Sequence, residues 1–167
     1  MIDRYLDVLT FVAALGCALV AGIFYAFSSF VMKALSRLPR PQGIAAMQSI
    51  NVAVLNPSFL IPFFGAAAAC VALAVLMMVI ESGGADRTYR LIGSLAYLAG
   101  TIFVTIAFNV PRNDKLASVD PASAPGSAIW TDYVRGWTAW NHVRAAAALV
   151  AAASLTMALL NSRSPDM

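Results

Sequence analysis

The segment WTAWNHVR, residues 137–144, contains side chains that could do chemistry in a chain that is otherwise mostly apolar. It holds Trp137, Trp140, Asn141, Arg144 and His142, and the last of these is the single histidine of the sequence. An imidazole beside an arginine in a water-poor crevice stays neutral more readily, and a neutral imidazole can act as a base or as a ligand. The segment therefore predicts a binding or catalytic crevice with aromatic walls.

A helix through this segment divides these side chains between two adjoining faces. At 100° per residue, four of them and Tyr133 fall on one face about 100° wide; the four are Trp137, Trp140, Asn141 and Arg144. His142 points about 100° away from Asn141, on a stripe with Thr138 and Arg135. One small ligand can touch both faces only in a crevice between helices or beside a bent helix.

The composition indicates a membrane protein. Hydrophobic residues make up 60% of the chain and charged residues 11%, with a mean hydropathy of +0.77. About a quarter of the residues of a soluble domain are charged. The scattered basic residues include no run and no interleaved aromatic platform, so the net charge of +3 does not predict nucleic-acid binding.

Four charge-poor windows are close to the roughly 20 residues that a helix needs to cross the hydrocarbon of a bilayer. We place these spans at about 8–33, 58–80, 91–110 and 140–161, with Asn56-Pro57 as the break before the second. The first is too long for the apolar region of a signal peptide, and we expect it to remain as a span. Residues 41–55 predict an extra helix, interfacial or tucked among the spans, and Pro, Ser and Gly within 112–129 predict a flexible loop. The expected fold is an all-α integral membrane four-helix bundle, as one domain over residues 1–167.

Four spans bring the polar residues together at one end of the bundle. The ends of spans one and three and the starts of spans two and four emerge on the same face of the membrane. That face receives Tyr25, Ser28, Ser29, Gln48, Asn51, Asn56, Asn109, Asn113 and residues 137–144. Each of these residues alone has an ordinary explanation. Tryptophans form belts at membrane interfaces, an arginine can snorkel, asparagines cap helices and a histidine can be structural. Those explanations do not account for the gathering of all of them on one side.

Four phrases of the sequence resemble one family of membrane proteins. They are GIFYAFSSFVMKAL (22–35), AAMQSINVAVLNPSF (45–59), FNVPRNDKLA (108–117) and WTDYVRGWTAWNHVR (130–144). In this order they resemble the DUF1772 family of four-span proteins, which includes the fungal anthrone oxygenases. The resemblance covers nearly the whole chain.

The resemblance implies an oxygenase that oxidises a polycyclic phenolic ketone with O₂, without a metal or flavin cofactor. Removing a proton from the CH₂ group of an anthrone gives an electron-rich anthrolate, which can react directly with O₂. Loss of water from the resulting peroxide leaves a quinone. Such a site needs a base, a cation or donors for the forming oxyanion, and a dry aromatic slot. The slot also suits a quinol, a quinone or another lipid-soluble ring.

The family motif implies roles for particular residues. His142 is the candidate base, and Arg144, Asn141 and Asn109 are candidate stabilisers of the oxyanion. The candidate walls of the slot are Tyr25, Met47, Asn51, Trp137 and Trp140. The implied partners are a hydrophobic aromatic small molecule, O₂ and the lipid bilayer.

Two other classes of function remain open. His142 could be an axial ligand of a haem or metal, although one histidine per chain cannot form a bis-histidine site, and Cys17 and Cys70 are expected to be packing residues within spans one and two. The second class is a non-enzymatic protein that binds lipid or a partner helix in the aromatic crevice. The alanine-rich spans two and four allow close helix approach within or between chains, which is compatible with a homo-oligomer.

The distribution of basic residues favours a site that faces the cytoplasm. The face with the two long connections has Lys33, Arg37, Arg40, Arg112, Lys115 and Arg135, and the other face has Arg4, Arg87, Arg90 and Arg163. Positive residues are in excess on cytoplasmic loops. We therefore expect an integral protein of the bacterial inner (plasma) membrane with both termini outside.

Overall fold

The computed structural model describes residues 2–79 and 84–162, and within these ranges it is helical with no strand. The first span runs through α1 (Ile2–Ala26), a π-helical segment η1 (Phe27–Val31) and α2 (Met32–Arg37). Helix α3 (Arg40–Ala53) precedes the second span, α4 (Pro57–Val79). The third span comprises α5 (Ala85–Leu95), η2 (Ala96–Phe103), η3 (Thr105–Asn109) and α6 (Val110–Ala117), and α7 (Ala124–Ser162) is the fourth. Residue 80, the expected end of span two, and Arg163 lie outside the described residues.

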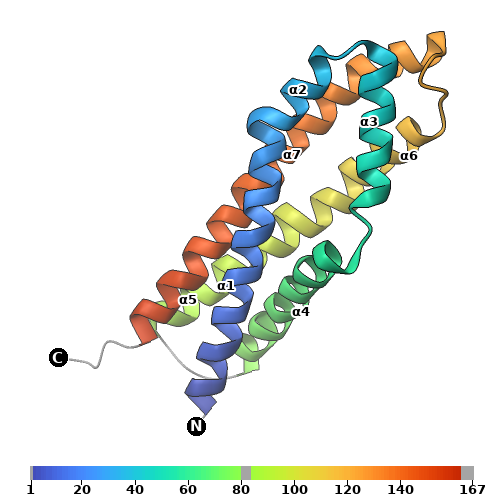
Figure 1. Ribbon diagram of the computed structural model, residues 1–167. Coiled ribbons are helices and arrows are strands. Elements are labelled where there is room, and N and C mark those ends of the chain that lie inside the picture. Colours follow the sequence, from blue (N-terminus) through green and yellow to red (C-terminus); the bar gives the residue numbers. More distant parts are fainter. Residues whose placement is uncertain (1, 80–83, 163–167) are drawn as a thin grey trace.

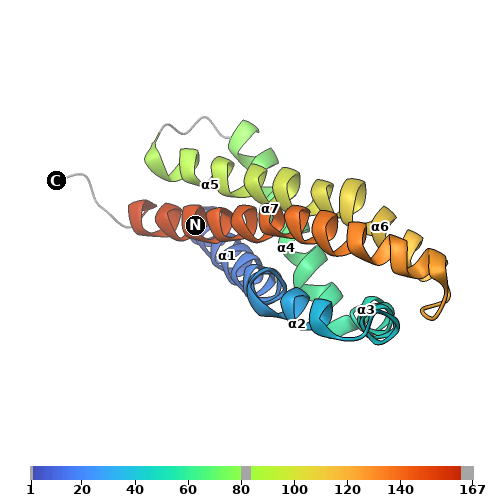
Figure 2. The ribbon, with the colours of Figure 1, turned by 90° about the horizontal axis from the view of Figure 1, so that it is seen from above.

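Four helical stretches are long and apolar enough to cross a membrane: Asp3–Arg37, Pro57–Val79, Ala85–Ala117 and Ala124–Ser162. The expected all-α membrane bundle is therefore confirmed. Figure 1 shows the spans running along one another, with the start of α1 and the end of α7 at the same end of the molecule. In the view from above, α7 lies between the first and third spans, and it packs on both (Figure 2).

The connection between the third and fourth spans is much shorter than the flexible loop expected over 112–129. Helix α6 continues to Ala117 and α7 starts at Ala124, so only residues 118–123 are not helical. Ser123 caps α7, because its Oγ accepts the N–H of Gly126 at 3.1 Å. Pro125 lies in the first turn, where a helix needs no N–H donor. The residues that favoured a loop thus form the start of a helix.

Helix α3 packs back on the bundle beside α2, α6 and α7 (Figure 1). Its buried residues are Gly43, Ile44 and Met47. A Cβ at Gly43 would lie 2.9 Å from the carbonyl oxygen of Leu35 and 3.0 Å from the Trp130 ring, so glycine permits this close approach. Gln48 ties the helix down further, since its Nε2 donates to the carbonyls of Leu116 at 2.8 Å and Val119 at 3.0 Å.

A buried arginine joins two helices at the opposite end of the bundle. Arg90 on α5 is 4% exposed and pairs with Asp86 one turn earlier and with Asp7 on α1 at 2.9 Å. Its Nε also donates to Thr10 Oγ1 at 3.1 Å. The sequence analysis counted Arg90 only among the basic residues of its membrane face, and the structure shows that it joins α1 and α5.

Candidate functional site

A cavity of about 250 Å³ lies in the half of the bundle that holds α3 and α6. All four spans and α3 contribute to its walls, which are mostly aliphatic and aromatic. The lining residues are Ile23, Phe24, Phe27, Met47, Ile50, Asn51, Val54, Leu55, Phe59, Leu60, Phe63, Phe64, Ile102, Thr105, Ile106, Val110, Asn113, Trp137 and Arg144. The cavity is therefore an apolar slot with a small number of polar groups, which is the usual make-up of a small-molecule site.

Of the described residues that line this cavity, Arg144 on α7 is the only charged one. It is 4% exposed, and its two terminal nitrogens donate to Asn141 Oδ1 at 2.8 Å and to Thr105 Oγ1 at 3.3 Å. The ion pairs found among residues 2–79 and 84–162 all belong to Arg90, so the Arg144 guanidinium has no acidic partner there. A buried charge is costly unless it is paired. The cavity thus carries a positive charge that an anionic ligand could balance.

Two aromatic rings flank the Arg144 guanidinium. Its central carbon lies 4.2 Å from the ring centre of Phe24 and 4.9 Å from that of Trp137, both within the range of cation–π attraction. These contacts offset part of the cost of burial and fix the plane of the side chain. They leave Nε without a hydrogen-bond partner.

Asn141 holds Arg144 in place from the side facing α1. Its Nδ2 donates to the carbonyl of Phe24 at 2.7 Å and to Ser28 Oγ at 2.8 Å, and its Oδ1 accepts from Arg144. The amide is fully buried, and both its nitrogen and its oxygen are hydrogen-bonded. Asn141 therefore positions the guanidinium relative to α1 and does not itself line the cavity.

Two asparagines of the third span position Trp137. Asn109 Nδ2 donates to the carbonyl of Trp137 at 3.2 Å, while its own Oδ1 is buried without a partner. Asn113 Oδ1 accepts both the indole N–H of Trp137 at 2.9 Å and the hydroxyl of Tyr133 at 2.8 Å. These bonds set the orientation of an aromatic wall of the cavity.

The three π-helical segments all contribute to this cavity. Phe27 comes from η1, Ile102 from η2, and Thr105 and Ile106 from η3. A π-helix is rare, and its single-turn insertions occur frequently at functional sites.

The structure brings together some of the residues that the sequence proposed. Met47, Asn51, Trp137 and Arg144 line the cavity, and Asn51 Nδ2 is buried without a hydrogen-bond partner. Asn141 and Asn109 lie directly behind it, as described above. These six residues form one site with the phenylalanines of α1 and α4.

His142, Tyr25 and Trp140 do not line the cavity. His142 and Tyr25 are exposed, because each directly follows a buried residue, Asn141 or Phe24, and one residue turns a helix by 100°. Trp140 is half-buried and stacks on Phe108, with ring centres 3.6 Å apart. The structure therefore corrects the expectation that these three side chains share a slot with Arg144.

Several residues that line the cavity were not found by the sequence reasoning. Phe24, Phe27 and Thr105 were not proposed, and Asn113 was noted only for its position. A signal was present in the third span, where Thr101, Thr105, Asn109 and Asn113 recur every four residues. Such a polar stripe in an apolar span indicates a face that contacts protein and not lipid.

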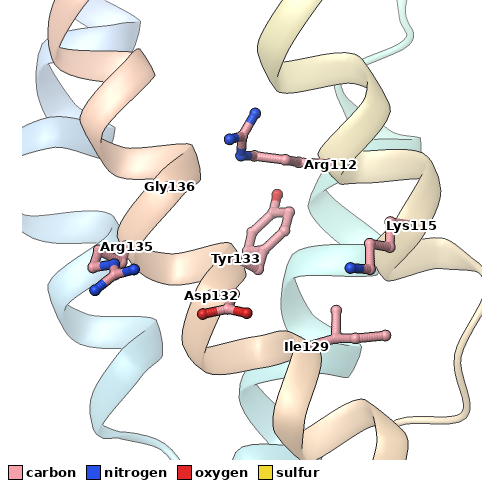
Figure 3. Close-up of a pocket in the computed structure, with 7 residues that line it drawn as sticks. All are labelled: Arg112, Lys115, Ile129, Asp132, Tyr133, Arg135 and Gly136. Carbon is pink, nitrogen blue, oxygen red and sulfur yellow. The ribbon is translucent and has the colours of Figure 1, made fainter.

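A second hollow, of about 380 Å³, lies between α6 and the first turns of α7 (Figure 3). It is lined by Arg112, Lys115, Ile129, Asp132, Tyr133, Arg135 and Gly136. Arg112 extends beside Gly136, where a Cβ would lie 2.9 Å from its Nε, and it donates to the carbonyl of Phe108 at 2.6 Å. This hollow contains charges of both signs and shares no lining residue with the apolar cavity.

Comparison with known proteins agrees with the resemblance noted in the sequence. The family model described as anthrone oxygenase matches residues 59–154, which is more than half of the chain and includes most of α4, the third span and most of α7. No curated protein and no solved structure matches the chain. The matched range contains Thr105, Asn109, Asn113, Trp137, Asn141 and Arg144. The chain belongs to the anthrone oxygenase (DUF1772) family of membrane proteins.

Proposed function

We propose that this protein oxidises an anthrone-like polycyclic phenol with O₂ inside the apolar cavity. The observation that carries the proposal is Arg144, a buried guanidinium with no acidic partner among the described residues, on the wall of an aromatic cavity. An anthrolate matches this site, because it has a flat apolar body and one anionic oxygen. The family membership supports the same class of reaction.

The proposed reaction balances with O₂ as the only oxidant. The CH₂ group of the anthrone loses one proton, which leaves an anthrolate whose charge lies largely on the ketone oxygen. The carbanionic carbon forms a bond to O₂ and, after protonation, becomes a hydroperoxide. Loss of the remaining C–H proton with cleavage of the O–O bond releases water and leaves the second carbonyl of the quinone. Arg144 stabilises the first oxyanion, and Asn51 Nδ2 is a free donor for oxygen at another part of the ring.

The position of His142 argues against its being the base that removes the proton of the ligand. Among the residues that the structure describes, no histidine or carboxylate lines the cavity, and His142 is on the outside of α7. We propose that Arg144 promotes the deprotonation of the bound ligand, because an unpaired cation in an apolar site lowers the pKa of a bound acid. The proton then leaves to water when the ligand binds. Asn109 and Asn141 act as positioning residues for Trp137 and Arg144.

The test is oxygen uptake by the detergent-purified protein given a model anthrone. We expect uptake above the spontaneous rate for the natural sequence, and a loss of about 100-fold to 1,000-fold in Arg144→Gln, because that change removes the charge that stabilises the oxyanion. The matched control is His142→Ala, which should keep the full rate, since His142 does not reach the cavity.

Two results would contradict the proposal. A strong loss in His142→Ala would restore the histidine as the base and require a different arrangement of the site. Uptake at the spontaneous rate in all three proteins would exclude anthrone oxidation. In that case the non-enzymatic alternative, a protein that binds lipid or a partner in its aromatic crevice, becomes the leading one.

A further inference from the structure

Four residues that line the cavity also form part of the outer surface of the molecule. Leu55 lies just before the second span, Phe64 lies within it, and Ile106 and Val110 come from the third. Their side chains are between 41% and 68% exposed, although each also faces the cavity. We call this set the apolar rim.

Three of the four residues of the apolar rim lie within candidate membrane spans. Phe64 lies within the candidate span Pro57–Val79, and Ile106 and Val110 lie within Ala85–Ala117. An exposed leucine or phenylalanine is ordinary on the surface of a membrane span. A group of them that also borders an internal cavity is different, because there the hydrocarbon and the cavity meet. The rim contains no charged or polar side chain that would close it off.

Arg144, the charged residue of the cavity, lies on a buried wall, because it is 4% exposed whereas the rim residues are at least 41% exposed. Arg144 donates to Thr105 there, and Trp137 is held by Asn113. A ligand in the rim therefore meets apolar side chains first and a cation afterwards. This order suits a molecule that dissolves in lipid in its neutral form and ionises only at Arg144.

We propose that the apolar rim is a lateral mouth through which an acidic aromatic ligand enters from the bilayer with its hydroxyl group leading. The class of ligand rests on the proposed function, whereas the route rests on the exposure of the rim alone. Delivery from lipid raises the local concentration of an apolar ligand, and the ion pair with Arg144 then retains it. A neutral ring of the same shape gains only the apolar contacts.

The test follows the fluorescence of Trp137 in the full chain, reconstituted in phosphatidylcholine vesicles. The chain has three tryptophans, so Trp130→Phe/Trp140→Phe leaves Trp137 as the single reporter. The probe is tribromophenol, whose bromine atoms quench indole fluorescence on contact. The matched probe is its methyl ether, tribromoanisole, which has no acidic hydroxyl. Both are compared at equal concentration in the bilayer.

We expect tribromophenol to quench Trp137 at a bilayer concentration about tenfold lower than tribromoanisole, because only the phenolate can form a charged hydrogen bond with Arg144. This preference should disappear in Arg144→Gln. If the two-substitution background does not fold, the difference between the natural chain and its Trp137→Phe variant isolates the same signal.

The route is tested by narrowing the mouth. Ile106→Phe/Val110→Phe should slow the onset of quenching several-fold after rapid mixing. Val71→Phe/Val75→Phe is the matched control, since both residues are exposed on α4 but do not line the cavity, and it should leave the rate unchanged. Equal rates in the two variants would overturn the lateral mouth, and equal quenching by the two probes would overturn the role of the acidic hydroxyl.

This outcome is separable from that of the oxygen-uptake experiment, because quenching needs no turnover. A chain that selects tribromophenol through the mouth but takes up no oxygen keeps the mouth and loses the oxygenase proposal. If the chain oxidises anthrone but the two double variants are quenched at equal rates, the oxygenase proposal stands and the lateral mouth is excluded.

Discussion

Arg144 is held by an amide at a place where a buried arginine would ordinarily have a carboxylate. Asn141 supplies one acceptor to the guanidinium and donates to the first span, to the Phe24 carbonyl of α1 and to Ser28 Oγ of η1. The amide thus positions the arginine without neutralising it. A site that binds an anion requires this distinction, because an internal carboxylate would compete with the ligand.

The substitution Asn141→Asp tests that distinction. The new carboxylate would accept from Arg144 and cancel its charge, so we expect oxygen uptake with anthrone to fall at least about tenfold, by the loss of a hydrogen bond to a charged ligand. Asn161→Asp, at the other end of α7, is the control and should keep the rate. An unchanged rate in Asn141→Asp would show that the charge of Arg144 is not used.

For single residues, the sequence predicted which residue types belong to the site better than the directions in which their side chains point. Trp137, Asn141 and Arg144 were found because they share a helical face; Trp137 and Arg144 line the cavity, and Asn141 lies behind it and holds Arg144. His142 and Tyr25 were misplaced because a step of one residue moves a side chain from the inside of the bundle to its surface. The wheel gives relative directions within a helix, and only packing against the other spans decides which direction is inward.

Between elements, bare glycines set how closely the spans approach. A Cβ at Gly100 in η2 would overlap the Cβ of Ala147 on α7, and one at Gly16 on α1 would lie 2.9 Å from the Cβ of Ala66 on α4. Small residues at such crossings allow helices in lipid to pack by van der Waals contact. The alanine-rich sequence of spans two and four predicted this kind of packing.

We expect Gly100→Ala to lower the free energy of unfolding by about 1–3 kcal/mol, the usual cost of overpacking a tight contact. Gly65→Ala is the matched control, because nothing lies within 4 Å of its added Cβ, and it should be neutral or slightly stabilising. Thermal or denaturant unfolding in detergent measures both. Equal stabilities in the two variants would mean that η2 moves away from α7 without cost.

Helix α3 is joined to the end of the third span by the hydrogen bonds of one side chain, in addition to its buried apolar contacts. Gln48→Leu preserves the size of the residue but removes both donors to the carbonyls at the end of α6 and just beyond. We expect faster hydrogen exchange over residues 40–53, because α3 can then open from the bundle more often. Gln42→Leu, at an exposed position of the same helix, should leave the exchange rates unchanged. Identical exchange in the two variants would place the attachment of α3 in its apolar contacts.

The π-helical segments are the part of the elements that the sequence did not reveal. Charge-free windows located the four spans, since hydropathy alone marks them. A π-helix depends on an inserted residue in the hydrogen-bonding ladder, which leaves no mark in composition or periodicity. The loop expected at 112–129 was too long for a related reason, because the cap at Ser123 outweighs the local preference of Pro and Gly for turns.

Over the whole molecule, the polar interactions are divided between the two ends. The end with α3 and α6 carries the cavity and its unpaired cation, and the other end carries the ion pairs of Arg90 with Asp7 and Asp86. The first arrangement leaves a charge free for a ligand. The second satisfies its charges internally and holds the spans together.

The substitution Arg90→Met should therefore affect stability without affecting chemistry. We expect a loss of about 1–3 kcal/mol in the free energy of unfolding, since the aspartates are partly exposed and can recover some hydration. Oxygen uptake per folded molecule should be unchanged. Arg37→Met, at an exposed position, is the control for stability, and a loss of uptake in Arg90→Met beyond the loss of folded protein would contradict the separation of the two ends.

The six-residue connection at 118–123 has a practical consequence for imaging a chain of 17.6 kDa, which is small for single-particle electron microscopy. Helices α6 and α7 both continue up to this turn, and Gln48 fastens the chain on its α6 side. A soluble helical protein spliced between Asp120 and Ser123 would therefore be joined through two ordered ends. The fused particle would gain mass and a rigid landmark outside the detergent micelle, on the side of the molecule nearest the cavity.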